Sequence, residues 1–317
     1  MTEKKAKPIS YSEIFHSIQG EGHYTGVPST WLRFFLCNLQ CDGFGQDDPT
    51  NPDSFDLPYL NIDVKDITNI EDLPVWEKGC DSSYSWSKKF KHLQHKHTAV
   101  EIANLLTDAN KNEYNPTGLW THPVSGQTTH LCITGGEPLM KHAQKAFVDI
   151  WNDRFRGNSV GWKPRDVTWE TNGTQELTDD FFNFVGNPGC FTARPFISCS
   201  PKLFTVSGEE AKRAIKPEFV AKYDDMVRRS NRTSTDIPHG QLKFVLGPKK
   251  EQWEELDDVI SQFRAAGVDW PVWIMPVGAT LEGQAMCDGD VAKMAQSRGF
   301  NVSARVHTYL YGNLIGV

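Results

Sequence analysis

The stretch RFFLCNLQCDGFGQDD, residues 33–48, decides how the rest of the chain is expected to fold. It opens with an apolar run typical of a buried strand and continues into a loop that carries Cys37 and Cys41, separated by three residues. A site built from thiolates needs three or four soft ligands close together. No further cysteine follows before Cys80. The loop is therefore expected to form part of a metal site that another part of the chain completes.

Composition and charge limit the class of protein. The chain has 317 residues, 38% of them hydrophobic, and a formal net charge of −7. It is long enough to bury a sizeable core, and its acidic balance argues against broad nucleic-acid binding. The charged start MTEKKAKPIS does not read as a secretory signal, and no run of about 18 apolar residues could span a membrane. We expect a cytoplasmic protein with neither a membrane nor a nucleic acid as partner.

The cysteines point to metal or to free thiols. There are seven cysteines, an odd number, in a chain without a recognisable secretion signal, and both observations argue against a disulfide framework. Cys132 and Cys199 lie in apolar runs and are expected to be core residues. Cys190 and Cys287 lie in loop-like surroundings without a partner motif.

Short apolar runs alternate with helical patterns along the chain. Thr98 and Glu101 form a capping box that opens a helix, residues 141–151 and 251–266 carry apolar side chains at helical spacing, and Gly267 ends the last of these. This alternation predicts an α/β protein with a mainly parallel sheet, either open and doubly wound or barrel-like. The strands are expected at residues 30–36, 130–134, 166–170, 195–199, 241–246 and 272–275.

Three long segments interrupt this alternation. They cover about residues 42–79, 107–129 and 203–238, and the first is rich in Asp, Pro and Asn. Connections of this length are usually functional loops or lids, and otherwise mobile insertions. We expect residues 1–317 to form one domain that carries these insertions.

A second motif follows the run LCI: Thr134-Gly135-Gly136-Glu137-Pro138. Paired glycines let the backbone approach a ligand closely, and they place the carboxylate beside it at the carboxyl end of a strand. The alternative is an ordinary strand-to-helix turn with Pro138 at an early helical position. The pentapeptide alone leaves both open.

Together, the two motifs resemble the radical S-adenosylmethionine (SAM) superfamily. In that superfamily three cysteines bind three irons of a [4Fe–4S] cluster, and the fourth iron is open to SAM. Phe44 stands where the usual third cysteine would be. However, the segment from Gly79 to Trp86, GCDSSYSW, resembles the third-ligand segment of one family, the 7-carboxy-7-deazaguanine synthases. The resemblance implies that residues 42–79 split the cluster loop and that Cys80 completes it.

Further motifs carry this resemblance from about residue 11 to the last residue. The stretch from His16 to Gly22, HSIQGEG, resembles the amino-terminal signature of the family, and Arg33 falls at the arginine of its first strand. Matches to later segments are ETNGT (170–174), SPK (200–202), LKFV (242–245) and the closing stretch from Arg305 to Val317.

The resemblance implies a partial (β/α)6 barrel of the radical SAM type and a role for each matched residue. Cys37, Cys41 and Cys80 would ligate the [4Fe–4S] cluster, and Ser82 would bind Mg²⁺. Contacts with SAM are implied for Gly135, Gly136, Glu137, Glu170, Ser200 and Lys202. Substrate contacts are implied for Gln19, Glu21, Arg33, His307 and the terminal carboxylate of Val317.

The implied reaction converts 6-carboxy-5,6,7,8-tetrahydropterin to 7-carboxy-7-deazaguanine by a radical ring contraction with loss of ammonia. The resemblance also implies a homodimer and an external, flavodoxin-like electron donor. The product would enter 7-deazapurine synthesis of the queuosine type, leading to tRNA or to another use such as DNA modification.

Several alternatives stay open on sequence alone. A zinc-stabilised binding protein could use the three cysteines with His92, His95 or His97, although those histidines also fit an exposed polar helix start. Another radical SAM enzyme, such as a glycyl-radical activase, would dock a protein instead of a pterin. Individual residues have ordinary roles too: Gln19 and Glu21 as solvated turn residues, Arg33 paired with a surface acid, and Tyr84 and Trp86 as packing.

Overall fold

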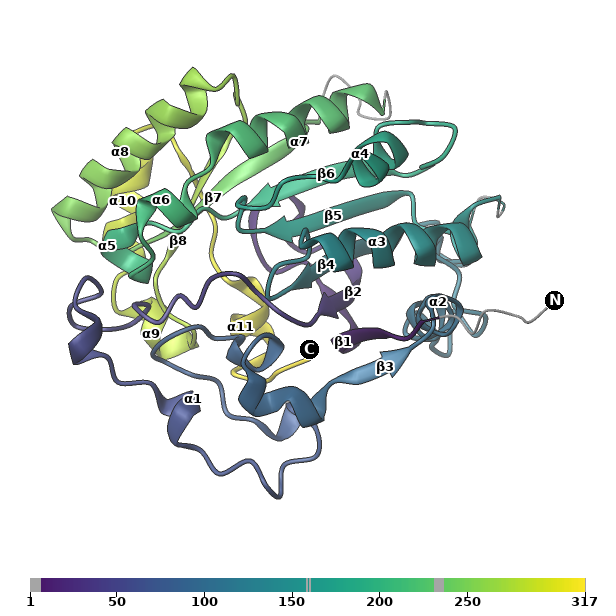
Figure 1. The fold of residues 1–317 in the computed structure, drawn as a ribbon, viewed down its shortest axis with the longest axis horizontal. Coiled ribbons are helices and arrows are strands. Elements are labelled where there is room, and N and C mark those ends of the chain that lie inside the picture. The colour runs from purple at the N-terminus through teal and green to yellow at the C-terminus, as the bar shows by residue number, and fades with distance from the viewer. Residues whose placement is uncertain (1–6, 158, 160, 231–236, 317) are drawn as a thin grey trace.

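A computed structural model describes residues 7–157, 159, 161–230 and 237–316. Within these residues, nine strands form one sheet in the order β3-β1-β2-β4-β5-β6-β7-β8-β9 (Figure 1). The sheet is open, with β3 and β9 at its edges. The strands are β1 (Ile9–Ile18), β2 (Pro28–Phe34), β3 (His95–His97), β4 (His130–Gly135), β5 (Asp166–Thr171), β6 (Arg194–Cys199), β7 (Gly240–Leu246), β8 (Val272–Pro276) and β9 (Asn301–Val302).

All six expected strands are confirmed, as β2 and β4 to β8, and the α/β class is confirmed with them. From β2 to β9 the neighbours pair in parallel, whereas β1 is antiparallel to both β2 and β3. The carboxyl ends of the parallel strands therefore meet at one edge of the sheet, where ligands of α/β proteins bind.

Helices connect the parallel strands and cover the sheet (Figure 1). The capping box opens α2 as expected: Thr98 N donates to Glu101 Oε2 over 2.7 Å. Gly267 follows α8 with a φ of +86°, which fits the expected stop. The α-helices are α1 (Pro58–Asn61), α2 (Ala99–Asp108), α3 (Lys141–Ile150), α4 (Asp179–Val185), α5 (Phe204–Ser207), α6 (Ala211–Ala214), α7 (Pro217–Arg229), α8 (Lys250–Ala265), α9 (Leu281–Ala285), α10 (Asp288–Ser297) and α11 (Val306–Tyr311).

Aromatic side chains dominate the core between helices and sheet. Trp169 of β5 is fully buried and meets Phe147 of α3 and Phe181 of α4 at ring-centroid distances of 5.0 and 5.7 Å, edge to face. Such pairs add about 0.5–1.5 kcal/mol beyond the area they bury. Cys132 and Cys199 are buried in β4 and β6, as expected for core residues.

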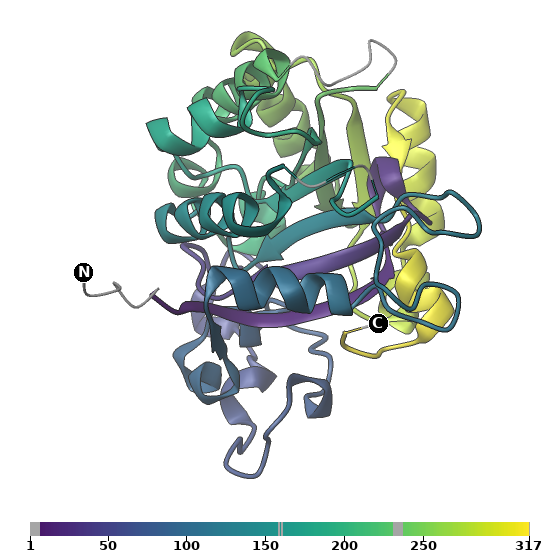
Figure 2. The same ribbon diagram turned by 90° about the vertical axis from the view of Figure 1, so that its right-hand side faces the viewer.

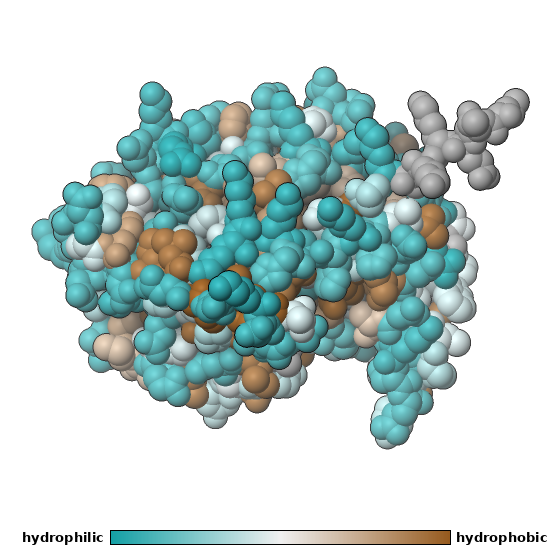
Figure 3. Space-filling view, turned by 60° about the horizontal axis from the view of Figure 1, so that its bottom comes forward, coloured by the Kyte–Doolittle hydropathy of each residue, from teal (hydrophilic) through white to brown (hydrophobic). Residues whose placement is uncertain are grey.

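Residues 42–79 form a separate small lobe below the sheet (Figure 2). The lobe contains α1 and short 3-10 turns but no strand in this part of the described chain. It shares a hydrophobic cluster with the segment that follows it, residues 84–93, and the surface on this side of the molecule is mainly hydrophilic (Figure 3). The buried members of that cluster are Tyr59, Ile70, Leu73, Trp76, Tyr84, Phe90 and Leu93.

The other two long segments differ in character. Residues 109–128 hold turns and an isolated bridge between Thr121 and Thr128. The segment after β6 instead contains α5, α6 and α7, so a large part of it is the helical crossover to β7. Residues 231–236 of that segment lie outside the described residues. No described helix is long and apolar enough to cross a membrane.

Candidate active site

A cavity of about 350 Å³ opens at the carboxyl edge of the sheet. Thirteen of the fifteen residues assigned a site role from the sequence line it. Glu137 is buried beneath the cavity, and Val317 lies outside the described residues. The thirteen are Gln19, Glu21, Arg33, Cys37, Cys41, Cys80, Ser82, Gly135, Gly136, Glu170, Ser200, Lys202 and His307.

The structure brings Cys80 back to the first two cysteines. Gly79 N donates to the Phe44 carbonyl over 2.7 Å, so the chain returns beside the point from which it left. Cys37 and Cys80 pack against the same small cluster as buried Cys41. The convergence that the split-loop interpretation requires is thus present in the described chain.

Burial keeps these thiols protonated when no metal is bound. It raises the pKa of Cys37 to about 12, helped by the charge of Glu137. Burial also raises the pKa of Cys41 well above its usual value, and that of Cys80. A bound metal reverses this preference, because its positive charge favours the thiolate.

The three cysteine thiols are soft ligands of the kind that bind iron–sulfur clusters. Among the described residues, no three His, Cys, Asp or Glu side chains are placed to hold one metal ion. In an iron–sulfur cluster each thiolate binds a different iron, so the sulfurs need not converge on one point. Polar groups already face the Cys37 sulfur, with Leu39 N at 3.4 Å and Asn172 Nδ2 at 3.9 Å. The residues present therefore fit a cysteine-bound iron–sulfur cluster.

The Gly-Gly turn allows β4 to end against the cysteine loop. A Cβ on Gly136 would lie 2.4 Å from the Leu36 carbonyl oxygen and 2.7 Å from Cys37 Cβ. A Cβ on Gly135 would lie 2.6 Å from the Phe34 carbonyl oxygen. The segment does join β4 to α3 by a turn, as the alternative has it, but Pro138 is not at an early helical position, because α3 begins only at Lys141.

Glu137 ties neighbouring strand ends together. Its carboxylate is fully buried and accepts hydrogen bonds from Leu139 N, Thr171 Oγ1 and Asn172 N at 2.7–2.8 Å. Burial raises the pKa of this carboxyl to about 7 despite these donors. In the structure the side chain joins the end of β4 to the end of β5, and its contact with a cofactor stays a prediction.

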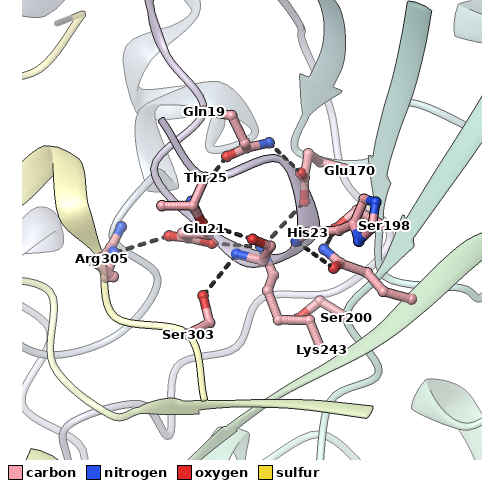
Figure 4. Close-up of polar contacts among 12 residues, drawn as sticks. Gln19, Glu21, His23, Thr25, Glu170, Ser198, Ser200, Lys243, Ser303 and Arg305 are labelled. Carbon is pink, nitrogen blue, oxygen red and sulfur yellow. Dashed lines mark hydrogen bonds and ion pairs between the residues drawn. The ribbon is translucent and has the colours of Figure 1, made fainter. Parts of the chain in front are cut away.

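Gln19 and Glu21 lie in a buried polar network (Figure 4). Gln19 is 3% exposed and donates from Nε2 to Glu170 Oε1 over 2.9 Å. Lys243 Nζ contacts Glu21 Oε2 at 2.5 Å and Glu170 Oε2 at 3.2 Å. The alternative of solvated turn residues is therefore wrong. Although burial alone would raise it, Lys243 and Arg305 hold the pKa of Glu21 well below its usual value.

Arg305 connects this network to the segment after Cys80. Its Nε lies 3.1 Å from Glu21 Oε1, and its Nη2 lies 2.8 Å from Asp81 Oδ2. These two contacts raise the pKa of the guanidinium, although burial opposes them. The amino-terminal turn, the returning cysteine segment and the carboxyl-terminal region are thereby joined through one side chain.

Arg33 also pairs with an acid, but not at the surface. Its Nε lies 2.5 Å from Oε1 of Glu13, a buried residue on β1, which also accepts a hydrogen bond from Tyr84 Oη over 3.0 Å. Tyr84 is a packing residue of the lobe cluster and a polar contact at once. Both Tyr84 and Arg33 line the cavity.

Sequence reasoning missed Lys243, Arg305, Asp81 and Glu13 as members of the site. Lys243 and Arg305 lie within motifs quoted from the sequence, and Asp81 follows Cys80 directly, so a signal existed for these three. Glu13 lies on β1, a strand that the apolar pattern did not predict. Its role depends on the pairing of β1 with β2, which local sequence does not reveal.

The remaining candidates line the cavity at its rim and floor. Lys202 Nζ donates to Ser200 Oγ over 3.0 Å, and Ser82 Oγ lies 3.6 Å from Cys80 Sγ. His307 packs so closely on the amino-terminal turn that a Cβ on Gly20 would overlap its ring. None of His92, His95 and His97 lines the cavity, so the described structure does not assemble the Cys3His site of the zinc alternative.

The open α/β sheet and its thiol-lined cavity define an α/β protein with a charged candidate active site at the strand ends. No protein-family model matches the chain. The chain is 23% identical to a 7-carboxy-7-deazaguanine synthase from Halobacterium salinarum, over 97% of this chain and 91% of the relative. It is also 23% identical to a 7-carboxy-7-deazaguanine synthase from Leptospira interrogans, over 97% of this chain and 98% of the relative. The crystal structure of QueE from Escherichia coli matches distantly, with a TM-score of 0.46, 16% identity and 96% of each chain covered.

The protein is therefore an enzyme, and the resemblance to 7-carboxy-7-deazaguanine synthases that its motifs predict is confirmed along almost its whole length.

Proposed function

We propose that the protein is a radical SAM enzyme that converts 6-carboxy-5,6,7,8-tetrahydropterin to 7-carboxy-7-deazaguanine, with loss of ammonia. The observation that carries this proposal is one shared cavity at the strand ends. It gathers three thiols, the Gly-Gly turn and the polar groups of the amino- and carboxyl-terminal motifs from segments far apart in the chain.

Cys37, Cys41 and Cys80 would hold a [4Fe–4S] cluster, with Gly135, Gly136 and Lys202 lining the space for SAM beside it. When bound, the cluster and SAM supply hydrogen-atom abstraction, which no protein side chain offers. The chain's own contribution is to place the substrate carbon and to keep water out. Phe15 and Trp31 suit the second task, because their rings stack in parallel 5.8 Å apart at the cavity wall.

The charged groups match the two ends of the pterin. Gln19 and the carboxylate of Glu21 suit the amidine-like edge of the ring, since one donates and accepts and the other only accepts. Lys243 and Arg305 keep Glu21 ionised for this role. Arg33 would bind the substrate carboxylate, sharing its guanidinium with Glu13. His307 would close the same site from the carboxyl-terminal side.

Magnesium is the third proposed cofactor. Ser82 offers a hydroxyl beside Asp81, whose side chain is 40% exposed, and such oxygen ligands suit a Mg²⁺ that keeps several waters. We further propose a partial (β/α)6 barrel shape for the sheet, insertions at about residues 42–79, 107–129 and 203–238, a cytoplasmic homodimer and a flavodoxin-like electron donor.

An anaerobic assay tests the function. The reconstituted protein is incubated with SAM, a strong reductant, Mg²⁺ and the carboxy-tetrahydropterin, and the product mass is read directly. We expect 7-carboxy-7-deazaguanine in wild type and in Cys190→Ala, whose thiol does not line the cavity. Cleavage of SAM without conversion of the pterin would support a radical SAM enzyme but contradict 7-carboxy-7-deazaguanine synthase activity. A colourless protein with one zinc would contradict both assignments.

A further inference from the structure

The carboxylate of Glu209 binds the backbone of the cysteine loop. Its Oε1 accepts hydrogen bonds from Gln40 N over 2.6 Å and from Cys41 N over 2.8 Å. Glu209 lies just before α6 in the connection from β6 to β7, and it is 6% exposed. No motif of the sequence singles it out. A buried carboxylate needs such donors, because an unpaired charge in this position would be costly.

The two donors form an anion-binding turn. Cys41 has a φ of +56°, in the left-handed region that a non-glycine residue enters only at a cost of about 1 kcal/mol or more. Two successive amides, those of Gln40 and Cys41, donate to one carboxylate oxygen just before this residue, as in the backbone nests that bind anions and iron–sulfur clusters. Glu209 supplies the anion here, so its side chain stabilises the strained turn that orients the Cys41 thiol.

Other contacts extend the same support along the loop. Gly43 N donates to the Ser207 carbonyl over 2.9 Å, and Arg213 Nη2 donates to the Asn38 carbonyl over 2.9 Å. The two backbones approach so closely that a Cβ on Gly43 would lie 2.6 Å from Gly208 N. Residues 207–213 therefore hold the loop from residue 38 to residue 43.

We propose that Glu209 is a positioning residue for the cluster site, acting through the backbone of residues 40 and 41. The loop is interrupted after Cys41 by the lobe, and residues 207–213, in the connection from β6 to β7, contact its backbone. The negative charge of Glu209 also lies beside the site and disfavours the addition of an electron to a cluster bound there. The cluster part of this inference rests on the proposed function.

The first test uses metal-free protein and needs no activity. The rate at which iodoacetamide alkylates Cys41 is measured by peptide mass in wild type, Glu209→Ala, Glu209→Gln and the control Glu210→Ala. Glu210 is the exposed neighbour. We expect alkylation of Cys41 to be faster by about tenfold or more in Glu209→Ala, because two hydrogen bonds to a charged acceptor are lost. Glu209→Gln, which keeps an acceptor oxygen, restores part of the protection, and Glu210→Ala matches wild type.

Buried Cys132 is the internal standard for folding. Fast alkylation of Cys132 in Glu209→Ala would mean that this variant is unfolded. The rate of Cys41 alkylation in Glu209→Gln is then compared with that in wild type instead. Equal Cys41 rates in wild type and in a folded Glu209 variant would overturn the inference.

The second test uses the reconstituted protein. Glu209→Gln is expected to raise the midpoint potential of the cluster, measured by electron paramagnetic resonance during redox titration, whereas Glu210→Ala leaves it unchanged. An unchanged potential in Glu209→Gln would contradict the electrostatic part. If wild type takes up no iron, the proposed function is contradicted. Faster alkylation of Cys41 in Glu209→Ala than in wild type would then still show that Glu209 positions the loop.

Discussion

Gly79 donates its amide to the carbonyl of Phe44, and this 2.7 Å hydrogen bond joins the two ends of the lobe. A Cβ on the next residue, Gly45, would lie 2.3 Å from the Glu77 carbonyl oxygen. The segment that leaves the cysteine loop is thus in direct backbone contact with the segment that returns to it. Cys41 and Cys80 stand just outside this closure on either side. Their proximity follows from the closure and does not depend on what the lobe contains.

Replacing Cys80 by alanine is expected to abolish iron binding as completely as Cys37→Ala does. A cluster with an open iron has three protein thiolates, and losing one leaves an iron without its ligand. Iron and sulfide are determined after anaerobic reconstitution, with Cys190→Ala as the control that retains both. Normal iron content in Cys80→Ala would show that the third ligand lies elsewhere.

The Gly136→Ala substitution is expected to destabilise the protein by about 1–3 kcal/mol, as overpacked sites do. Its methyl group would overlap the Leu36 carbonyl and Cys37 Cβ, which belong to the loop that directly follows β2. Urea denaturation of metal-free protein gives the change in the free energy of unfolding. The control is Gly289→Ala in α10, where a Cβ meets nothing within 4 Å and helix propensity adds up to about 1 kcal/mol of stability. Equal effects at the two glycines would contradict the close approach.

Lys243→Met is expected to cost about 3–5 kcal/mol, because it leaves Glu170 buried without its cation and Glu21 with Arg305 alone. The matched control is Lys250→Met. That side chain is 86% exposed and pairs with Glu254 on the surface of α8, so its loss is expected to change stability by less than about 0.5 kcal/mol. The free energy of unfolding in urea is compared for both variants. A loss below about 1 kcal/mol at Lys243 would mean that water reaches the network.

Glu137 is expected to make stability depend on pH between about 4.5 and 7. Burial raises the pKa of this carboxyl from 4.5 to about 7 in the folded protein. The folded state thus holds the proton more tightly, so the contribution is complete below pH about 4.5 and is lost as the pH rises through about 7.

Glu137→Gln removes this titration at the cost of one acceptor for Asn172 N. The stability advantage of wild type over Glu137→Gln is expected to shrink by up to about 3 kcal/mol from pH 5 to pH 8. The difference in stability between wild type and Glu137→Gln cancels the contribution of other groups that titrate in a similar pH range. One such group is His130, whose pKa burial lowers to about 4. A difference that stays constant with pH would show that Glu137 remains ionised throughout.

The parallel core of the fold was predictable because its strands are apolar runs bounded by turn residues. Strand β1 was not, since its exposed and buried positions do not alternate cleanly, and β3 and β9 span only three and two residues. Without β1, Glu13 could not be placed beside Arg33. Short edge strands gain their stability from pairing, which local sequence does not encode.

The residues of the candidate site that belong to a sequence motif were predictable. Residues that contribute by contacting other members of the site were harder to predict. Gln19, Glu21 and the three cysteines were singled out because their motifs resemble those of a family, and all five line the cavity. Glu209 was not, because a single glutamate in a polar connection has no pattern, and its role exists only when β6 and β2 place their following loops together. Glu137 was found, but its burial under the cavity depends on three donors from two other segments.

The backbone contact between residues 44–45 and 77–79 has a consequence for how this enzyme tolerates change. Because the entropy of closing a loop grows only with the logarithm of its length, the free energy of the closure is nearly indifferent to how many residues lie between. The apolar side chains of the lobe share a cluster with Tyr84, Phe90 and Leu93, so the apolar part of the lobe is not replaceable, whereas its residues 50–54 are all exposed. Residues 50–54 are therefore a tolerant site for inserting a different domain, provided that the two ends of the lobe still meet.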